Sequence, residues 1–133
     1  MPLALEIVTP EGVTFTGEVT SVVIPSTEGE LGILPDHVGL IVQLEPGELR
    51  ATHEGKEIIL AVGGGFAEVL SNRVAVLTDM AVREDEIDEQ AAEQAMRRAE
   101  QAMREKKLEG EEYATVAAAL QRSIAQLKVK RRR

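Results

Sequence analysis

Four polar side chains in one short segment, residues 26–37, have types that can bind a cation. The segment reads Ser-Thr-Glu-Gly-Glu-Leu-Gly-Ile-Leu-Pro-Asp-His, and its charged or ionisable members are Glu28, Glu30, Asp36 and His37. Carboxylates and an imidazole are metal ligands, but this spacing matches no common metal-binding motif, and no second histidine supports it. We therefore predict no metal site here and interpret the segment as a charged loop that contacts another molecule.

The backbone of this segment is constrained as well. Gly29 and Gly32 permit conformations that a Cβ would exclude. Pro35 lacks a backbone donor, so we expect no central strand to run through it. Apolar residues between these positions can fix the loop to a core, and the sequence thus predicts a rigid loop.

Signals for catalysis elsewhere are weak. The chain has no cysteine, which excludes disulfides, thiolate metal sites and a thiol nucleophile. The second histidine, His53, falls in a predicted hairpin turn, where we expect it to be exposed. The glycine run at residues 63–65 lacks the lysine and hydroxyl residue of a phosphate-binding loop, so it indicates a close approach between strands. We predict a protein that is not an enzyme and uses no cofactor.

The charge of the chain is unevenly distributed. The net charge is −8, but residues 1–80 carry 12 acidic and 3 basic side chains, whereas residues 113–133 carry no acidic and 6 basic ones. The acidic first part, nearly free of aromatic residues, argues against nucleic-acid binding. The basic end indicates docking against an acidic partner surface. Alternatively, these cations simply complement the negative end of the last helix dipole.

Short strands separated by turns are expected up to about residue 80. Leu3, Leu5 and Ile7 alternate with period two before a turn at residues 9–12. A further strand should end at Pro25. The other predicted strands cover residues 38–44, 49–52, 57–62, 66–70 and 73–78, with hairpin turns at 53–56 and 71–72. This pattern is typical of an antiparallel β-sandwich or flattened barrel, with an aliphatic core because aromatics make up only 2% of the chain.

The composition changes to helix-forming after residue 80. We predict a first helix capped by Asp85 and ended by Gly110, then a second helix that begins at Glu111. Together they form an antiparallel α-helical hairpin. The predicted apolar stripes are Ala91, Ala95, Ala99 and Ala102 in the first helix, and Tyr113, Val116, Ala117, Leu120, Ile124 and Leu127 in the second. The fold class is α+β, with a β-sandwich over residues 1–83 and a two-helix domain over residues 84–133.

The abundance of alanine predicts a weak interface in the hairpin. A buried CH₂ is worth only ~0.8 kcal/mol, so each alanine contributes little. Both helices nevertheless have high intrinsic propensity and can remain helical if they separate. The hairpin is therefore suited to opening; a hairpin fixed permanently to the sandwich is the alternative.

Three segments resemble the ε subunit of F-type ATP synthases in sequence and in order. They are residues 22–37, 61–69 and 124–128, of which the first is the most specific. Asp36 departs from the family, which often has glycine before the histidine, but Asp tolerates a positive φ better than most residues. The resemblance covers essentially the whole chain.

The resemblance implies a non-catalytic rotor subunit in the central stalk of a proton- or sodium-translocating ATP synthase. The β-sandwich would pack on the γ subunit and rest on the polar loops of the ring of membrane subunits, the c-ring. Glu28, Glu30 and His37 are the residues that the resemblance places at this interface. An acidic loop that faces a basic loop is a reasonable pairing, since charge complementarity fixes register.

The resemblance also implies a regulatory role for the C-terminal helices. In the family they can extend along γ into the α/β catalytic head and block ATP hydrolysis. Arg122, Lys128 and Lys130 would then meet acidic residues of the catalytic subunits. We expect this subunit to inhibit hydrolysis by such contacts.

Some members of the family bind ATP through an Ile/Leu-Asp-x-x-Arg-Ala motif at the start of the first helix. Ile87, Asp88 and Ala92 match this motif, but Ala91 occupies the position of its arginine. In the second helix Gln126 stands where another arginine is expected. Alanine cannot replace a charged, bidentate guanidinium, so we expect ATP binding to be weak or absent.

The expected location is the cytoplasmic face of the bacterial inner membrane, as a peripheral subunit without lipid insertion. No signal or transit peptide is visible, and no apolar run approaches the ~18 residues that span a bilayer. The alternative function is a freestanding small-ligand or regulatory binding module with the helical hairpin as a lid. A stalk subunit should expose an apolar patch when isolated, whereas such a module should contain a ligand-sized pocket.

Overall fold

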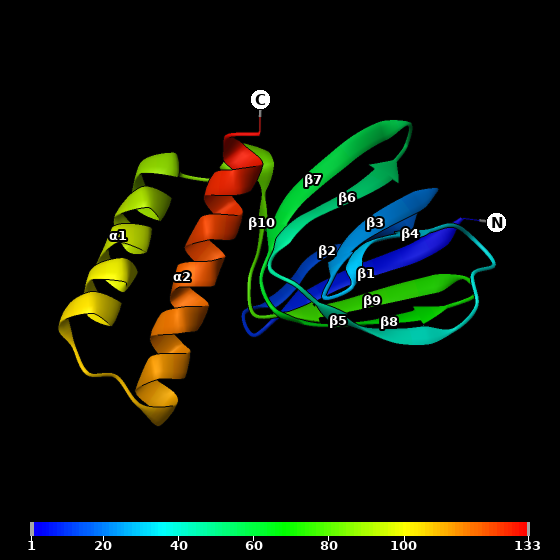
Figure 1. Ribbon diagram of the computed structural model, residues 1–133. Helices are drawn as coiled ribbons and strands as arrows, with labels where there is room; N and C mark the ends of the chain where they lie inside the picture. The colour runs from blue at the N-terminus through cyan, green and yellow to red at the C-terminus, as the bar shows by residue number, and fades with distance from the viewer. Residues whose placement is uncertain (1, 133) are drawn as a thin grey trace.

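The computed structural model describes residues 2–132, in which strands precede helices (Figure 1). The strands are β1 (Leu3–Thr9), β2 (Gly12–Val19), β3 (Ser21–Ser26), β4 (Gly29–Ile33), β5 (Leu40–Leu44), β6 (Gly47–His53), β7 (Lys56–Val62), β8 (Gly65–Leu70), β9 (Arg73–Thr78) and β10 (Ala81–Arg83). The 3₁₀ turn η1 (Glu84–Glu86) leads to the helices α1 (Glu89–Glu105) and α2 (Gly110–Lys130). The predicted order of a β-domain followed by a helical hairpin is confirmed.

The strands form one sheet that folds over itself into two layers (Figure 1). Their order is β10-β7-β6-β3-β5-β8-β9-β1-β2, with β4 paired to β3. A single residue pair, Ser26 with Leu44, joins β3 to β5, and the sheet bends at this point. The described strand pairs are antiparallel except for β1 and β9, which run parallel. The predicted flattened barrel is confirmed.

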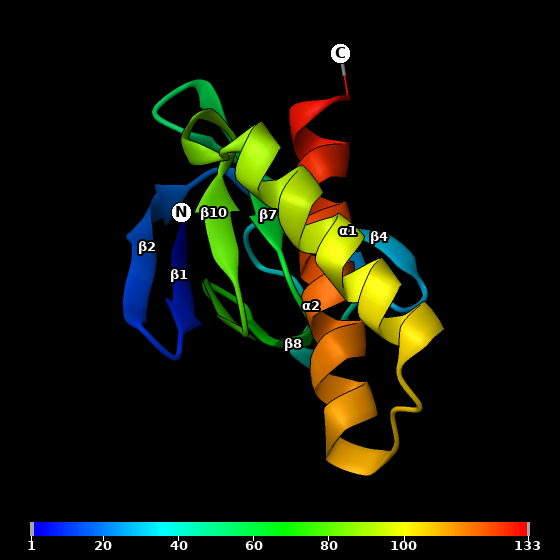
Figure 2. The same cartoon turned by 90° about the vertical axis from the view of Figure 1, so that its left-hand side faces the viewer.

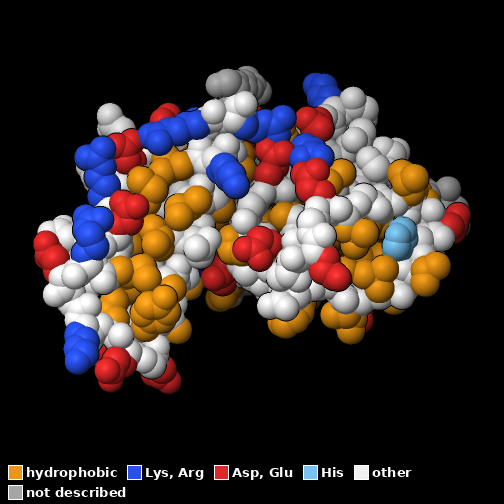
Figure 3. Space-filling view, viewed as in Figure 1, with side chains coloured by type: hydrophobic (Ala, Val, Ile, Leu, Met, Phe, Trp, Pro, Cys, Tyr) orange, Lys and Arg blue, Asp and Glu red, His pale blue; other side chains and the backbone are white. Residues whose placement is uncertain are grey.

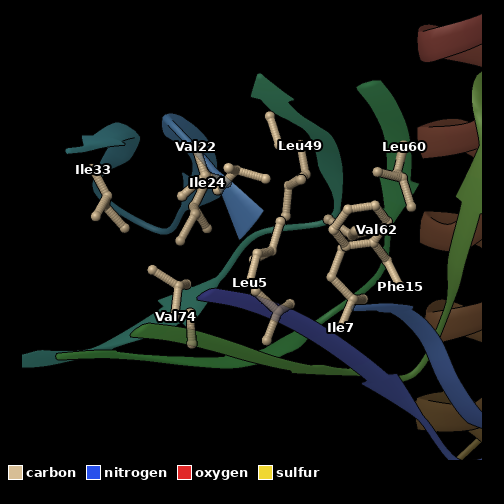
Figure 4. Close-up of a cluster of buried hydrophobic side chains, with 14 of the residues drawn as sticks. Leu5, Ile7, Phe15, Val22, Ile24, Ile33, Leu49, Leu60, Val62 and Val74 are labelled. Carbon is tan, nitrogen blue, oxygen red and sulfur yellow. The ribbon is translucent and has the colours of Figure 1, made fainter. Parts of the chain in front are cut away.

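Aliphatic side chains fill the space between the two layers. Figure 4 shows side chains such as Leu5 and Val74 from one layer and Leu49 and Leu60 from the other pointing into this space. All four are at most 1% exposed. They alternate with outward residues because successive side chains of a strand point to opposite faces. This core contains only residues from the strands, so the β-domain has a core of its own.

Two predictions about the N-terminal strands were wrong. The segment 26–37 is not entirely a loop, because Gly29–Ile33 forms β4 and pairs with β3. Pro25 does not end β3, which continues to Ser26. Pro25 has no N–H to donate, but the backbone hydrogen bond at this position is made by its carbonyl, which accepts the N–H of Glu45 at 2.9 Å. The sheet can therefore accommodate Pro25.

The helix boundaries also differ from the prediction. Asp88 rather than Asp85 caps α1, and its carboxylate accepts the N–H of Ala91 at 3.0 Å. Asp85 lies in η1. The first helix ends at Glu105, well before Gly110, and residues 106–109 connect it to the second helix. Gly110 does adopt a positive φ of 58°, but it begins α2.

The second helix covers the β-domain, and the first helix lies outside it (Figure 2). Contacts of α2 run to β6, β7 and η1. Val129 is 1% exposed and packs with Ala61 of β7 and with Ile87. The predicted stripe holds for Leu127, which is buried, but Tyr113 is 50% exposed because the β-domain does not reach the first turns of α2. None of the described helices is long and apolar enough to cross a bilayer.

The alanines of α1 are only partly where the predicted stripe placed them. Ala99 is buried, and so is Ala92, which the stripe left out. Ala91 is exposed instead. The stripe at the start of the helix is thus rotated by one residue from the prediction, because Ala92 lies two turns from Ala99 and shares its buried face.

Candidate functional site

The hairpin formed by β3 and β4 presents the two predicted glutamates. Its turn is closed by Ser26, whose Oγ donates to the carbonyl of Gly29 at 2.5 Å and accepts the N–H of Glu28 at 3.2 Å. The residues Glu28 and Glu30 are both exposed. Glu30 lies 2.8 Å from the guanidinium of Arg50 on β6. The hydrogen bond and the positive charge of Arg50 hold the pKa of Glu30 below its ordinary value.

The third predicted contact residue, His37, belongs to a different set of contacts. Its Nδ1 lies 2.8 Å from the carbonyl of Val38. The preceding residue, Asp36, occupies the position where the family often has glycine, and it adopts a positive φ of 67°. Its N–H donates to the carbonyl of Ser71 at 2.6 Å. Among residues 2–132, no group of three or more histidines and carboxylates is arranged to hold a metal ion.

An exposed apolar row crosses the outer face of the second layer. In this row Phe66 of β8 pairs with Leu77 of β9, Leu77 with Val8 of β1, and Val8 with Val13 of β2. Phe66, Leu77 and Val13 are each more than half exposed. Hydrophobic side chains protrude along the lower edge of the β-domain, where β8 and β9 lie (Figures 1 and 3). An exposed row of apolar side chains of this kind is typical of an interaction surface.

Two basic residues of α2 form hydrogen bonds outside their own helix, Arg122 to the β-domain and Lys130 to η1. Arg122 donates to Asp79 at 3.2 Å, and the ammonium of Lys130 donates to the carbonyl of Glu84 at 3.2 Å. Lys128 is exposed and lines a hollow of about 370 Å³ between α2 and the β3–β4 hairpin. Two of the three predicted inhibitory residues are therefore engaged within the chain while the hairpin is docked.

The two arginines after α2 also form ion pairs. Arg131 reaches back to the first turns of α1, at 2.6 Å from Glu89 and 2.5 Å from Glu93. Arg132 contacts Glu48 of β6. Acidic and basic side chains alternate where the end of α2 meets the β-domain (Figure 3). The basic end of the chain thus has acidic partners within the same molecule.

The residues that match the ATP-binding motif have structural roles here. Ile87 is buried against β7, Asp88 caps α1, and Ala92 is buried. Ala91 is exposed, so it leaves room for a longer side chain but supplies no charge. A second hollow, of about 340 Å³, lies between α2 and the β1–β2 turn, with Arg122 in its wall already paired with Asp79.

Sequence reasoning missed the partners of the predicted residues. Arg50 lies in a predicted strand and Asp79 follows one, and the pairing of each depends on the fold. A signal was present for Arg50, since it is one of only 3 basic residues among the first 80. The apolar row could also have been predicted from the sequence of β9, which has apolar residues on both faces. This pattern is typical of a strand that is covered on each side.

Both parts of the chain match a known family. Residues 2–84 match "ATP synthase, Delta/Epsilon chain, beta-sandwich domain", and residues 85–131 match "ATP synthase, Delta/Epsilon chain, long alpha-helix domain". The ATP synthase epsilon chain of Herpetosiphon aurantiacus is 50% identical over 129 residues, covering 97% of this chain and 94% of that one. The epsilon chain of Halorhodospira halophila is 44% identical over 128 residues, covering 95% and 90%.

Solved structures agree with this assignment. A chain in the Euglena gracilis mitochondrial ATP synthase (OSCP/F1/c-ring) superposes with a TM-score of 0.72 at 27% identity, over 90% of this chain and 76% of that one. A chain of the Tetrahymena thermophila central stalk/c-ring has the same fold, with a TM-score of 0.60 at 13% identity, over 98% and 97%. These matches favour the stalk subunit over the freestanding binding module. The chain belongs to the family of ATP synthase epsilon chains, the non-catalytic subunits of the F-type central stalk.

Proposed function

We propose that this subunit couples rotation of the c-ring to the catalytic head and restrains ATP hydrolysis. The parent enzyme would be a proton- or sodium-translocating ATP synthase, with this subunit peripheral at the cytoplasmic face of the bacterial inner membrane. In this proposal residues 1–83 dock on the γ subunit and the c-ring, and residues 84–133 regulate. The observation that carries the proposal is the exposed apolar row on the β-domain, beside a hairpin that presents paired and unpaired acids.

The apolar row is the proposed γ-binding surface. Phe66, Leu77 and Val13 are 56%, 54% and 58% exposed, so a partner can still bury about half of each side chain. Full burial of such side chains is worth roughly 1.5–3 kcal/mol each, and half of that for several residues supports a stable interface. The charged Glu68 on the same strand would lie at its polar rim.

The β3–β4 hairpin is the proposed contact with the c-ring. Glu28 and Glu30 are exposed at the turn, and Arg50 keeps Glu30 ionised by lowering its pKa. His37 follows in the same segment. A basic loop of the c-ring would be attracted to these acids, and the charge pattern would fix its register.

The helical hairpin is the proposed brake. It is held to the β-domain by a small apolar contact around Val129 and by the ion pair of Arg122 with Asp79, while Lys130 joins the end of α2 to η1. Extension into the catalytic head would exchange these contacts for acidic residues of the α/β subunits, with Lys128 free to join them. A switch from mostly docked to mostly extended takes about 5.5 kcal/mol of differential binding.

The brake can be tested by ATP hydrolysis of a catalytic head that lacks this subunit. We expect the full chain to suppress hydrolysis, and a truncation after Arg83 to bind without suppressing it. The truncation retains the complete core of the β-domain. If both forms bind and neither inhibits, the regulatory role is wrong; if neither binds, the stalk role is wrong.

The γ-binding surface has a separate test in affinity for γ. Phe66→Asp places a charge at one end of the apolar row, and we expect binding to fall at least tenfold. Asn72→Asp is the matched control, because it adds the same charge at an exposed turn outside the row. Equal effects of the two changes would contradict the assignment of this surface.

A further inference from the structure

A continuous series of ion pairs joins the end of α2 to the β3–β4 hairpin. Arg132 contacts Oε1 of Glu48, and Oε2 of the same carboxylate accepts from Arg50 at 2.8 Å. The Nη1 atom of Arg50 that donates to Glu48 also lies 2.8 Å from Oε2 of Glu30. Positive and negative groups alternate along this series, which we call the ion-pair relay. It connects residues up to 102 positions apart in the chain, from Glu30 to Arg132.

The two inner members of the relay are better shielded than the outer ones. The side chains of Glu48 and Arg50 are 19% and 26% exposed, whereas those of Glu30 and Arg132 are 58% and 36% exposed. Glu30 is therefore open to a partner, while the inner pair lies where water screens charge less effectively. A change of charge at Glu30 is felt by its neighbours in the relay.

The far end of the relay lies beside the contact that holds α2 in place. Arg132 follows closely after Val129, which is 1% exposed against Ala61 of β7. Loss of the pairing to Glu48 would free the last turn of α2 at this contact. Arg132 also lies in the field of Glu84 and Glu57, which attract it but do not link it to Glu30.

We propose that the ion-pair relay couples the charge state of Glu30 to the docking of α2, so that a cationic partner at Glu30 loosens the helix. While Glu30 is negative, Arg50 is shared between two carboxylates, and Glu48 retains charge for Arg132. When a cation neutralises Glu30, Arg50 turns fully to Glu48. The positive charge of Arg50 then competes with that of Arg132 for the carboxylate of Glu48, and the end of α2 is held less tightly.

The proposed function enters only in naming the cationic partner, which would be a basic loop of the c-ring. The coupling itself is a property of the isolated chain and needs no other subunit. Contact at the ring end of the β-domain would thereby favour release of the helices that act as the brake. Failure of this coupling would leave the stalk role intact, and failure of the stalk role would leave the coupling measurable.

The test is a double-mutant cycle on the full chain, read by hydrogen exchange of the α2 amides at residues 124–129. Glu30→Gln should raise these exchange rates two- to three-fold. The same change in an Arg132→Gln background should leave them unaltered, because the far end of the relay is already lost. Glu48→Gln should likewise abolish the effect of Glu30→Gln.

Glu28→Gln is the matched control, because it removes the same charge two residues away and lies outside the relay. It should not change the exchange of α2. The proposal fails if Glu30→Gln has no effect, or if its effect is equal with and without Arg132. Success and failure of the proposal can both be interpreted, because the substituted side chains lie outside the buried core and the variants retain that core.

Discussion

Arg122 of α2 and Asp79, which directly follows β9, form an ion pair of 3.2 Å across the boundary between the hairpin and the β-domain. The pair depends on Gly63, since a Cβ at this position would lie 1.8 Å from Oδ1 of Asp79 and 3.5 Å from Cγ of Arg122. Gly63 thus leaves room for Asp79, the ion-pair partner of Arg122. This finding gives Gly63 a role in docking of the helix.

Gly63→Ala should loosen α2 by displacing the carboxylate of Asp79. The side chains of Arg122 and Asp79 are both more than a third exposed, so we expect loss of this ion pair to cost only about 0.5 kcal/mol of docking free energy. Hydrogen exchange of α2 measures the effect. In an Asp79→Ala background the space is free, and Gly63→Ala should then cost less; an unchanged cost would contradict the steric explanation.

Gly65→Ala should destabilise the β-domain far more than a change at its neighbour. Gly65 has a φ of 145°, and a Cβ there would lie 2.0 Å from the carbonyl oxygen of Leu77, which belongs to the backbone and cannot turn aside. We expect a loss of about 3 kcal/mol in the free energy of unfolding, measured by urea denaturation. Gly64→Ala, with nothing within 4 Å, is the control and should cost about 1 kcal/mol or less.

Acid should remove the contribution of Glu30 to stability. Its folded pKa is depressed by Arg50, so the stabilisation is present above the ordinary glutamate pKa of about 4.3 and is lost as pH falls through the lower folded value. A carboxyl NMR titration should show Glu30 titrating below the ordinary range. In the Arg50→Gln variant the pKa should return to that range, and a value that stays low would exclude Arg50 as the cause.

Arg131→Gln should loosen the start of α1 from α2. Arg131 joins Glu89 and Glu93 to the end of α2, and the alanine-rich contact between the helices has little other stabilisation. Hydrogen exchange in the first two turns of α1 should accelerate, while the β-domain is unaffected. Arg98→Gln is the control, because the hydrogen bond described for Arg98 runs to the backbone of Gln94 on its own helix.

ATP should not bind with micromolar affinity, as measured by isothermal titration. Ala91 lacks the guanidinium of the motif, and Asp88 is already used to cap α1. Ala91→Arg restores the charge at an exposed position, so it should fold normally and tighten any binding at least tenfold, since a charge-assisted hydrogen bond is worth about 1.5–3 kcal/mol. Ala91→Lys is the control for charge without bidentate geometry. Micromolar binding by the unaltered chain would refute the prediction.

The local patterns of the sequence account for the architecture. Alternation at Leu3, Leu5 and Ile7 predicted a buried face of β1, and all three are at most 1% exposed. The change in composition after residue 80 predicted the helical hairpin. Periods of two and of 3.6 residues arise within each element, so they can be read without knowing its neighbours. The family signature in residues 22–37 identified the chain because it is a property of the sequence alone.

Boundaries and partners depended on contacts between distant segments. β4 forms because β3 offers it a hydrogen-bonding edge. The charged pairs join residues far apart in sequence: Arg50 and Glu30 are 20 positions apart, and Arg132 and Glu48 are 84 apart. The sequence shows that these residues are charged, but an ion pair needs proximity, and proximity between such distant positions arises only when the sheet folds over and α2 docks on it.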